Sequence, residues 1–65
     1  MTFRIHYTVP GPLGNGRRLW SMLGNFTSVE EAHEHALWAA RQYGSDVEIF
    51  DIEGDQVIED VPAPD

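Results

Sequence analysis

The N-terminal segment alternates between apolar and polar side chains with a period of two. Its apolar positions are Phe3, Ile5, Tyr7 and Val9. A period of two is typical of a β-strand with one buried face, and it predicts a strand over residues 2–9. We expect this strand to present one apolar face to a core and one polar face to water.

Three further strands are predicted along the chain. In residues 17–25, Trp20 and Met22 share one face of the pattern, with Phe26 as a further candidate for it, and Leu19, Ser21 and Leu23 share the other. Apolar side chains on both faces indicate either a strand covered on both sides or an exposed apolar patch on the face away from the helix. Residues 46–52 and 56–61 are joined by Glu53-Gly54-Asp55, a sequence suited to a tight hairpin turn. Residues 10–16 are rich in proline and glycine, and they predict a loop.

Residues 28–43 carry the start and stop signals of a helix. Two capping boxes fit its start: Ser28 with Glu31, and Thr27 with Glu30. The sequence therefore allows the helix to begin at either of two adjacent residues. Gly44 supplies the left-handed residue that commonly ends a helix, so the end is better defined than the start.

One face of this predicted helix is rich in alanine. At about 100° per residue, that face collects Val29, Ala32, Ala36, Ala39, Ala40 and Tyr43. Because alanine side chains are small, we expect the helix to pack closely across the strands. Trp38 lies about 180° from Val29, among polar residues, on the face that should meet water.

The order of the elements predicts an α+β protein. We expect a four-stranded antiparallel sheet with one helix packed on one face, in ββαββ order. The strand order 2-1-3-4 keeps all neighbours antiparallel, whereas the order 1-2-3-4 needs a parallel pair and ranks second. Residues 1–61 are expected to form a single domain, and residues 62–65 a disordered tail.

Composition narrows the class of protein. The chain has 65 residues, no cysteine and a net charge of −7. So short a chain buries only about 60% of the surface that its unfolded form exposes, and self-association is the remaining way to stabilise it without disulfides. With no long apolar run and no signal-peptide pattern, we expect a cytoplasmic protein that does not contact membranes. Its acidity disfavours direct nucleic-acid binding.

No set of residues has the spacing of a catalytic or metal site. His33 and His35 are two positions apart and diverge by about 200° on a helix, so they cannot bind one metal ion together. The acidic turn at residues 51–55 is too short for a calcium loop. We therefore expect no catalytic residue, no metal, no cofactor and no enzymatic activity.

Two candidate surfaces remain for a protein partner. The first is apolar and has two separate regions, one on the polar side of the helix and one on the sheet face opposite the helix. The helix region is Trp38, His35 and Gln42, and the sheet region is Leu19, Leu23, Phe50 and Ile52. The second is acidic: Asp46, Glu48, Asp51, Glu53, Asp55, Glu59 and Asp60. We expect a non-catalytic protein-interaction module that forms a homodimer. The alternatives are an acidic decoy that binds a basic nucleic-acid-binding protein, and a small-ligand binder at Trp38 or at loop 10–16.

The run FTSVEEAHEHALWAARQYGSDVEIFDIEGDQVIE combines a helix cap, alanines at helical spacing, a Gly-Ser pair and two strands around a turn glycine. This order resembles that of small uncharacterised bacterial and phage ββαββ domains. The resemblance implies the ββαββ fold. Because those families have no assigned activity, it implies no functional residue.

Overall fold

The fold is a four-stranded sheet with one helix. The computed structural model describes residues 2–11 and 16–64. In these residues the elements are β1 (Phe3–Pro10), β2 (Arg18–Phe26), α1 (Val29–Tyr43), β3 (Val47–Asp51) and β4 (Gln56–Val61). The strands form one antiparallel sheet in the order β2-β1-β3-β4. The predicted α+β class, the ββαββ order and the preferred strand order are all confirmed.

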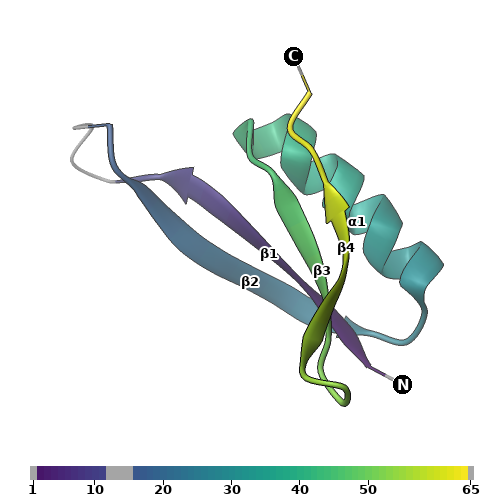
Figure 1. Ribbon diagram of the computed structural model, residues 1–65. Helices are drawn as coiled ribbons and strands as arrows, with labels where there is room; N and C mark the ends of the chain where they lie inside the picture. Colours follow the sequence, from purple (N-terminus) through teal and green to yellow (C-terminus); the bar gives the residue numbers. More distant parts are fainter. Residues whose placement is uncertain (1, 12–15, 65) are drawn as a thin grey trace.

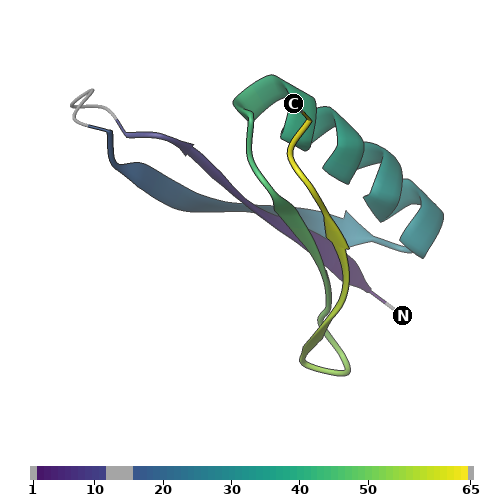
Figure 2. The ribbon, with the colours of Figure 1, turned by 45° about the horizontal axis from the view of Figure 1, so that its top comes forward.

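The molecule has two layers, because α1 lies across one face of the sheet (Figures 1 and 2). The helix packs mainly against the central strands β1 and β3. None of the described elements covers the other face of the sheet, which we call the open face. The face under α1 is the helix face.

The core lies between α1 and the helix face. Its strand residues are Phe3, Ile5, Tyr7, Phe26, Val47, Ile49 and Val61. The helix contributes only alanines: Ala32, Ala36, Ala39 and Ala40. The alanine face is therefore buried as predicted, whereas Val29 is exposed and Tyr43 is half-buried at the two ends of the stripe. Small side chains let the helix axis approach the sheet, and the larger strand residues fill the space between them.

Local side-chain chemistry sets both ends of α1. The Oγ of Ser28 accepts a hydrogen bond from the backbone N–H of Glu31 at 3.1 Å, so Ser28 is the N-cap. This contact decides between the two capping boxes that the sequence allowed. Gly44 ends the helix at φ 60°, a left-handed conformation that glycine adopts without steric cost.

A β-bulge at Asn25 interrupts the pairing of β2 with β1. Phe3 pairs with Phe26 and Arg4 pairs with Gly24, which leaves Asn25 as the extra residue, at φ 88°. The bulge reverses the alternation of side chains, so Phe26 enters the core on the same face as Leu23. Gly24 allows the strands to meet here, because a Cβ at this position would collide with Arg4 Cβ and lie 3.0 Å from Arg4 Cα.

Replacing Gly24 with alanine is expected to destabilise the β1–β2 hairpin. The added methyl group must displace the backbone of Arg4, and overpacking of this kind costs about 1–3 kcal/mol of the free energy of unfolding. Urea denaturation followed by circular dichroism measures the loss. Asn25→Gly is the matched control, because glycine adopts the φ of 88° more readily than asparagine. Equal stability of Gly24→Ala and the wild type would contradict the close approach.

The β1–β2 hairpin extends beyond the rest of the sheet as a two-stranded arm (Figure 1). Strand β3 pairs with β1 only from Phe3 to His6, so the residues from Tyr7 to Pro10 pair with β2 alone. The radius of gyration is 11.8 Å, against about 10.7 Å for a compact chain of this length. An isolated two-stranded hairpin is only marginally stable in water. The arm therefore needs further contacts to hold its position.

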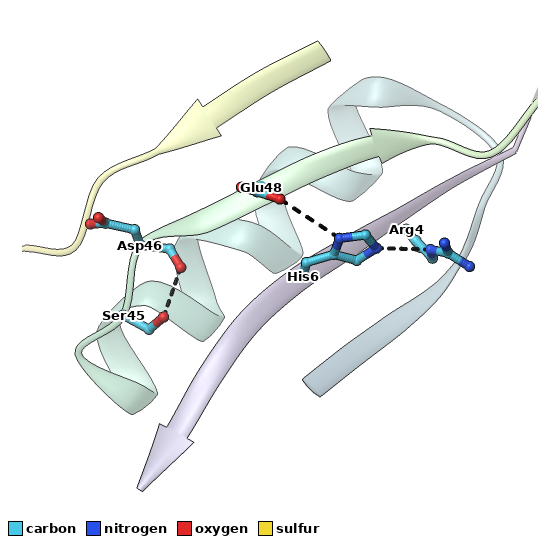
Figure 3. A network of polar contacts seen from close by, with 5 residues as sticks. All are labelled: Arg4, His6, Ser45, Asp46 and Glu48. Carbon is cyan, nitrogen blue, oxygen red and sulfur yellow. Dashed lines mark hydrogen bonds and ion pairs between the residues drawn. The ribbon is translucent and has the colours of Figure 1, made fainter. Parts of the chain in front are cut away.

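Hydrogen bonds of Ser45 and Arg18 fix the base of the arm to the end of α1. The buried Ser45 accepts a hydrogen bond from the backbone N–H of Thr8 at 2.9 Å. Ser45 Oγ in turn donates to the backbone oxygen of Asp46 at 2.7 Å, as Figure 3 shows. Arg18 donates from Nη2 to the backbone oxygen of Tyr43 at 2.6 Å, at the C-terminal end of α1 where a positive charge is favourable.

Candidate interaction surface

Strand β2 is the most apolar exposed element that the structure describes. It lies at the edge of the sheet and pairs only with β1. Its exposed large apolar residues are Leu19, Trp20, Met22 and Leu23, with Trp20 68% and Met22 63% exposed. Several exposed apolar side chains on one element mark an interaction surface more often than single ones do. We call these four residues the β2 patch.

The β2 patch faces both sides of the sheet. Leu19 pairs with Val9 and Leu23 pairs with Ile5, which places both leucines on the helix face. Trp20 and Met22 pair with Thr8 and His6 and therefore belong to the open face. A partner that covers both pairs has to meet the strand along its edge, because neither face alone gives access to all four side chains.

A groove opens between β2 and α1 on the helix face. It has a volume of about 370 Å³ and is lined by Leu23, Glu34, His35 and Trp38. Trp38 is 50% exposed, and its ring stands edge-on to Tyr43 with centroids 5.8 Å apart. Glu34 supplies a carboxylate beside these apolar walls. The groove can accept an apolar side chain that is followed or preceded by a positive charge.

His35 is fixed within this groove by two contacts. Its ring lies 4.6 Å from the ring of Phe26, between centroids. Its Nδ1 lies 3.0 Å from the backbone oxygen of Glu31, and because a carbonyl only accepts, Nδ1 carries the proton. The imidazole is therefore held as part of the groove wall.

The residues of the first predicted surface are grouped differently from the two regions that were expected. Leu23, His35 and Trp38 come together in the groove. Gln42 is exposed on α1, further along the helix. The prediction placed Leu19 and Leu23 on the face opposite the helix, and the pairing shows that this is wrong. The bulge at Asn25 is the physical reason, because it changes which alternating set of β2 shares a face with Phe26.

Phe50 and Ile52 are both half-buried, and β3 presents Phe50 on the open face, whereas Ile52 follows the end of the strand. Phe50 pairs with Arg4, whose guanidinium lies 4.9 Å from the centre of the Phe50 ring. The ring also stacks on His6 at 5.1 Å between centroids. Phe50 therefore belongs to a polar and aromatic cluster of its own on the open face, separate from the groove.

This open-face cluster orders Arg4, His6 and Glu48 in a row, as Figure 3 shows. Arg4 Nε donates to His6 Nε2 at 2.8 Å, so the lone pair of that nitrogen is occupied. The proton of His6 is then on Nδ1, which lies 3.7 Å from Glu48 Oε2. The row therefore links side chains of β1 and β3 across the open face. The expectation that the chain is not an enzyme stays a prediction.

Sequence reasoning missed Trp20 and Met22 as surface residues. It placed them on the same face as Phe26 and so expected them to be covered. The available signal was the presence of apolar residues on both faces of residues 17–25, which pointed to an exposed patch as one of two readings. The structure places exposed Trp20 and Met22 on the face away from the helix, whereas Leu19 and Leu23 are exposed on the helix face.

The predicted acidic surface is divided by the fold. Asp51 is buried, and its Oδ1 accepts hydrogen bonds from the backbone N–H groups of Glu53 and Gly54 at 3.1 and 3.2 Å, so it does not belong to an exposed surface. Glu48 and Asp60 pair with one another on the open face, whereas Glu59 pairs with Ile49 on the helix face. The remaining members, Asp46, Glu53 and Asp55, are exposed outside the strands. The decoy hypothesis stays a prediction, and these carboxylates give it no single surface.

The two central histidines of α1 point to different neighbours. His33 Nε2 lies 3.7 Å from Glu59 Oε1, whereas His35 packs on Phe26. Their predicted divergence is confirmed. Within residues 2–11 and 16–64, no three His, Asp or Glu side chains are close enough together to hold a metal ion. Loop 10–16, the other candidate for a small ligand, has residues 12–15 outside the described part of the chain.

The segment after β4 returns to the start of β3. The backbone N–H of Ala63 donates to Asp46 Oδ1 at 2.8 Å. Part of the expected tail, residues 62–65, therefore contacts the domain, while residue 65 lies outside the described residues.

Comparison with known proteins gives no relative for this fold and surface. No protein-family model matches the chain, and neither a curated protein nor a solved structure gives a significant match. The resemblance to small ββαββ domains therefore stays a prediction. In the described part of the chain, α1 is too short and too polar to cross a bilayer, and no other helix is present there. The cytoplasmic location also stays a prediction.

Proposed function

We propose that this protein is a small, non-catalytic interaction module that self-associates. The observation that carries the proposal is the β2 patch, four exposed apolar side chains on one edge strand. Burying apolar surface contributes about 25 cal/mol per Å². Trp20 and Met22 are the most exposed of the four, so they offer the largest gain on association.

Self-association would also stabilise a domain whose own core is small. The helix contributes only four alanines to the buried cluster, and the hairpin arm extends beyond the helix. A domain of this size has a marginal core, and small domains without disulfides often stabilise themselves by forming oligomers. Association through β2 would extend the apolar core along the arm, where it is thinnest.

The wild-type protein is expected to behave as a dimer at micromolar concentration, with twice the monomer mass of 7.3 kDa. Sedimentation equilibrium over a dilution series measures the dissociation constant. Trp20→Ala should weaken the dimer by about 30-fold, because truncating an interface tryptophan commonly costs about 2 kcal/mol or more. Val57→Ala is the control, since Val57 is an exposed apolar residue on the other edge strand.

A monomer at every working concentration would contradict self-association. An equal loss of affinity in the Trp20→Ala and Val57→Ala proteins would contradict the role of the β2 patch. Circular dichroism of both variants confirms that the fold is retained, so that a loss of affinity reports on the interface.

A further inference from the structure

We propose that two copies of the chain pair along their β2 edges, antiparallel, about a two-fold axis at Ser21. This inference rests on the proposed self-association and assigns its surface and register. The pairing would join two four-stranded sheets into one continuous sheet. A helix would cover each half, on the same side of the joined sheet.

The two edges of the sheet differ in how they are protected against pairing. Strand β2 is nine residues long, contains no proline and no lysine, and has Arg18 at its start as its only charged residue. Its bulge at Asn25 lies near its end, so residues 18–24 pair with β1 without interruption. Strand β4 has six residues, two adjacent carboxylates at Glu59 and Asp60, and a register shift that leaves Ile58 without a partner in the pairing. Charges and bulges block edge pairing, whereas a long apolar edge invites it. Of the two edge strands, β2 is therefore the one suited to pairing with a second copy.

The sequence of β2 is self-complementary about Ser21. A two-fold axis there places Leu19 opposite the second copy's Leu23 on the helix face. It also places Trp20 opposite the second copy's Met22 on the open face. Cross-strand pairs of aromatic and aliphatic side chains stabilise antiparallel sheets. All four residues of the β2 patch are then paired with apolar residues.

Neighbouring registers lose this match. An axis at Met22 would place Trp20 opposite the second copy's Gly24 and Leu19 opposite its Asn25. An axis at Trp20 would place Leu19 opposite the second copy's Ser21 and Arg18 opposite its Met22. Each shift by one axis position leaves exposed apolar side chains facing polar residues or glycine, so the Ser21 axis is the favoured register.

Charge favours the antiparallel direction. Arg17 precedes β2 and Arg18 begins it, whereas Glu30, Glu31 and Glu34 lie in the first half of α1, which follows the end of β2. Antiparallel pairing brings the basic start of one copy to the acidic end of the other, and a parallel arrangement would bring the two basic ends together. Opposite charges across an interface guide association and fix its register.

The groove on the helix face fits this arrangement. Leu23 forms one of its walls, and Glu34 and Trp38 form others. In the Ser21 register the second copy's Leu19 comes beside Leu23 and covers the apolar part of the groove. The second copy's Arg17 is two residues before Leu19 in the sequence and brings a positive charge to this end of the paired strands. The groove therefore receives an apolar side chain with a positive charge near it.

A cysteine at the axis tests the register directly, because the natural chain has no cysteine. In the Ser21→Cys protein, the two thiols would lie directly opposite each other, where Cα atoms of antiparallel strands are about 4.5–5.5 Å apart and a disulfide can form. Oxidised glutathione should convert it to a covalent dimer at least ten times faster than Met22→Cys and Glu59→Cys. Non-reducing electrophoresis over time measures the rates.

Each outcome of this experiment decides a point. Faster crosslinking of Met22→Cys would overturn the Ser21 axis. A Ser21→Cys rate no greater than that of Glu59→Cys, in a chain that still sediments as a dimer, would overturn edge pairing and leave self-association standing. A chain that is monomeric throughout would overturn the proposed function itself.

Hydrogen exchange provides a second test on the unmodified chain. A strand paired on one side protects about every second backbone amide, whereas a strand paired on both sides protects consecutive amides. At concentrations that favour the dimer, amides 19–23 should all be protected, and dilution should restore alternation. Strand β4 is the internal control and should alternate at both concentrations. Alternating protection of β2 in a dimeric sample would overturn the inference, whatever the cysteine variants show.

Discussion

Ile49→Ala is expected to unfold a large part of the protein at room temperature. Ile49 is 0% exposed, in the central strand β3 under α1. Removing a buried isoleucine side chain to alanine costs about 2–5 kcal/mol of the free energy of unfolding. The whole domain is expected to have only about 3–10 kcal/mol, from the usual stability per residue. Urea denaturation followed by circular dichroism measures the loss.

Ile58→Ala is the matched control, because it removes the same atoms from a residue that is 40% exposed. We expect it to cost less than about 1 kcal/mol, since part of that side chain is already in water. Both variants have to be compared at one protein concentration, because association adds to the apparent stability. Equal losses at the two positions would contradict the assignment of the core.

Local signals allowed the helix to be predicted from the sequence. Ser28, Gly44 and the spacing of the alanines act through atoms within a few residues, so the sequence contains all the information that they need. The alternation in residues 2–9 predicted β1 for the same reason. The strand order followed from keeping neighbours antiparallel, a constraint that needs no side-chain detail.

The alternation of apolar and polar residues in β2 could not predict which of its side chains face the helix. A period of two assigns faces only while the pairing is regular, and the bulge at Asn25 adds one residue to β2. Every assignment on one side of that residue is then reversed relative to Phe26. The close approach of Gly24 to Arg4 involves two strands, so neither segment reveals it alone.

The candidate surface was predicted in part, for the same reason. Trp38 was placed on the exposed side of α1 from helical geometry, and it is half exposed. Its neighbour Leu23 comes from another element, so the groove depends on tertiary packing. The burial of Asp51 had a local signal in the sequence. An aspartate three residues before a glycine commonly accepts hydrogen bonds from the turn that follows it.

Ala36→Leu is the second variant for which we expect a large effect. Ala36 is fully buried at the centre of the helix face, where α1 meets β1 and β3. A leucine there has to push the helix away from the sheet, and overpacking costs about 1–3 kcal/mol, occasionally more. Thermal denaturation monitored by circular dichroism should show a lower midpoint, and a wild-type midpoint would contradict close packing of the helix.

Gln42→Leu is the control for this change, because it adds a leucine to an exposed position of the same helix. Comparing Ala36→Leu with Gln42→Leu also distinguishes an effect on folding from an effect on association. Lifting α1 moves Trp38 and Glu34 away from Leu23, which widens the groove that the second copy is proposed to cover. The Ala36→Leu protein should therefore dissociate more readily even where it remains folded. An unchanged dissociation constant in a folded Ala36→Leu dimer would mean that the edges of β2 hold the two copies together without the groove.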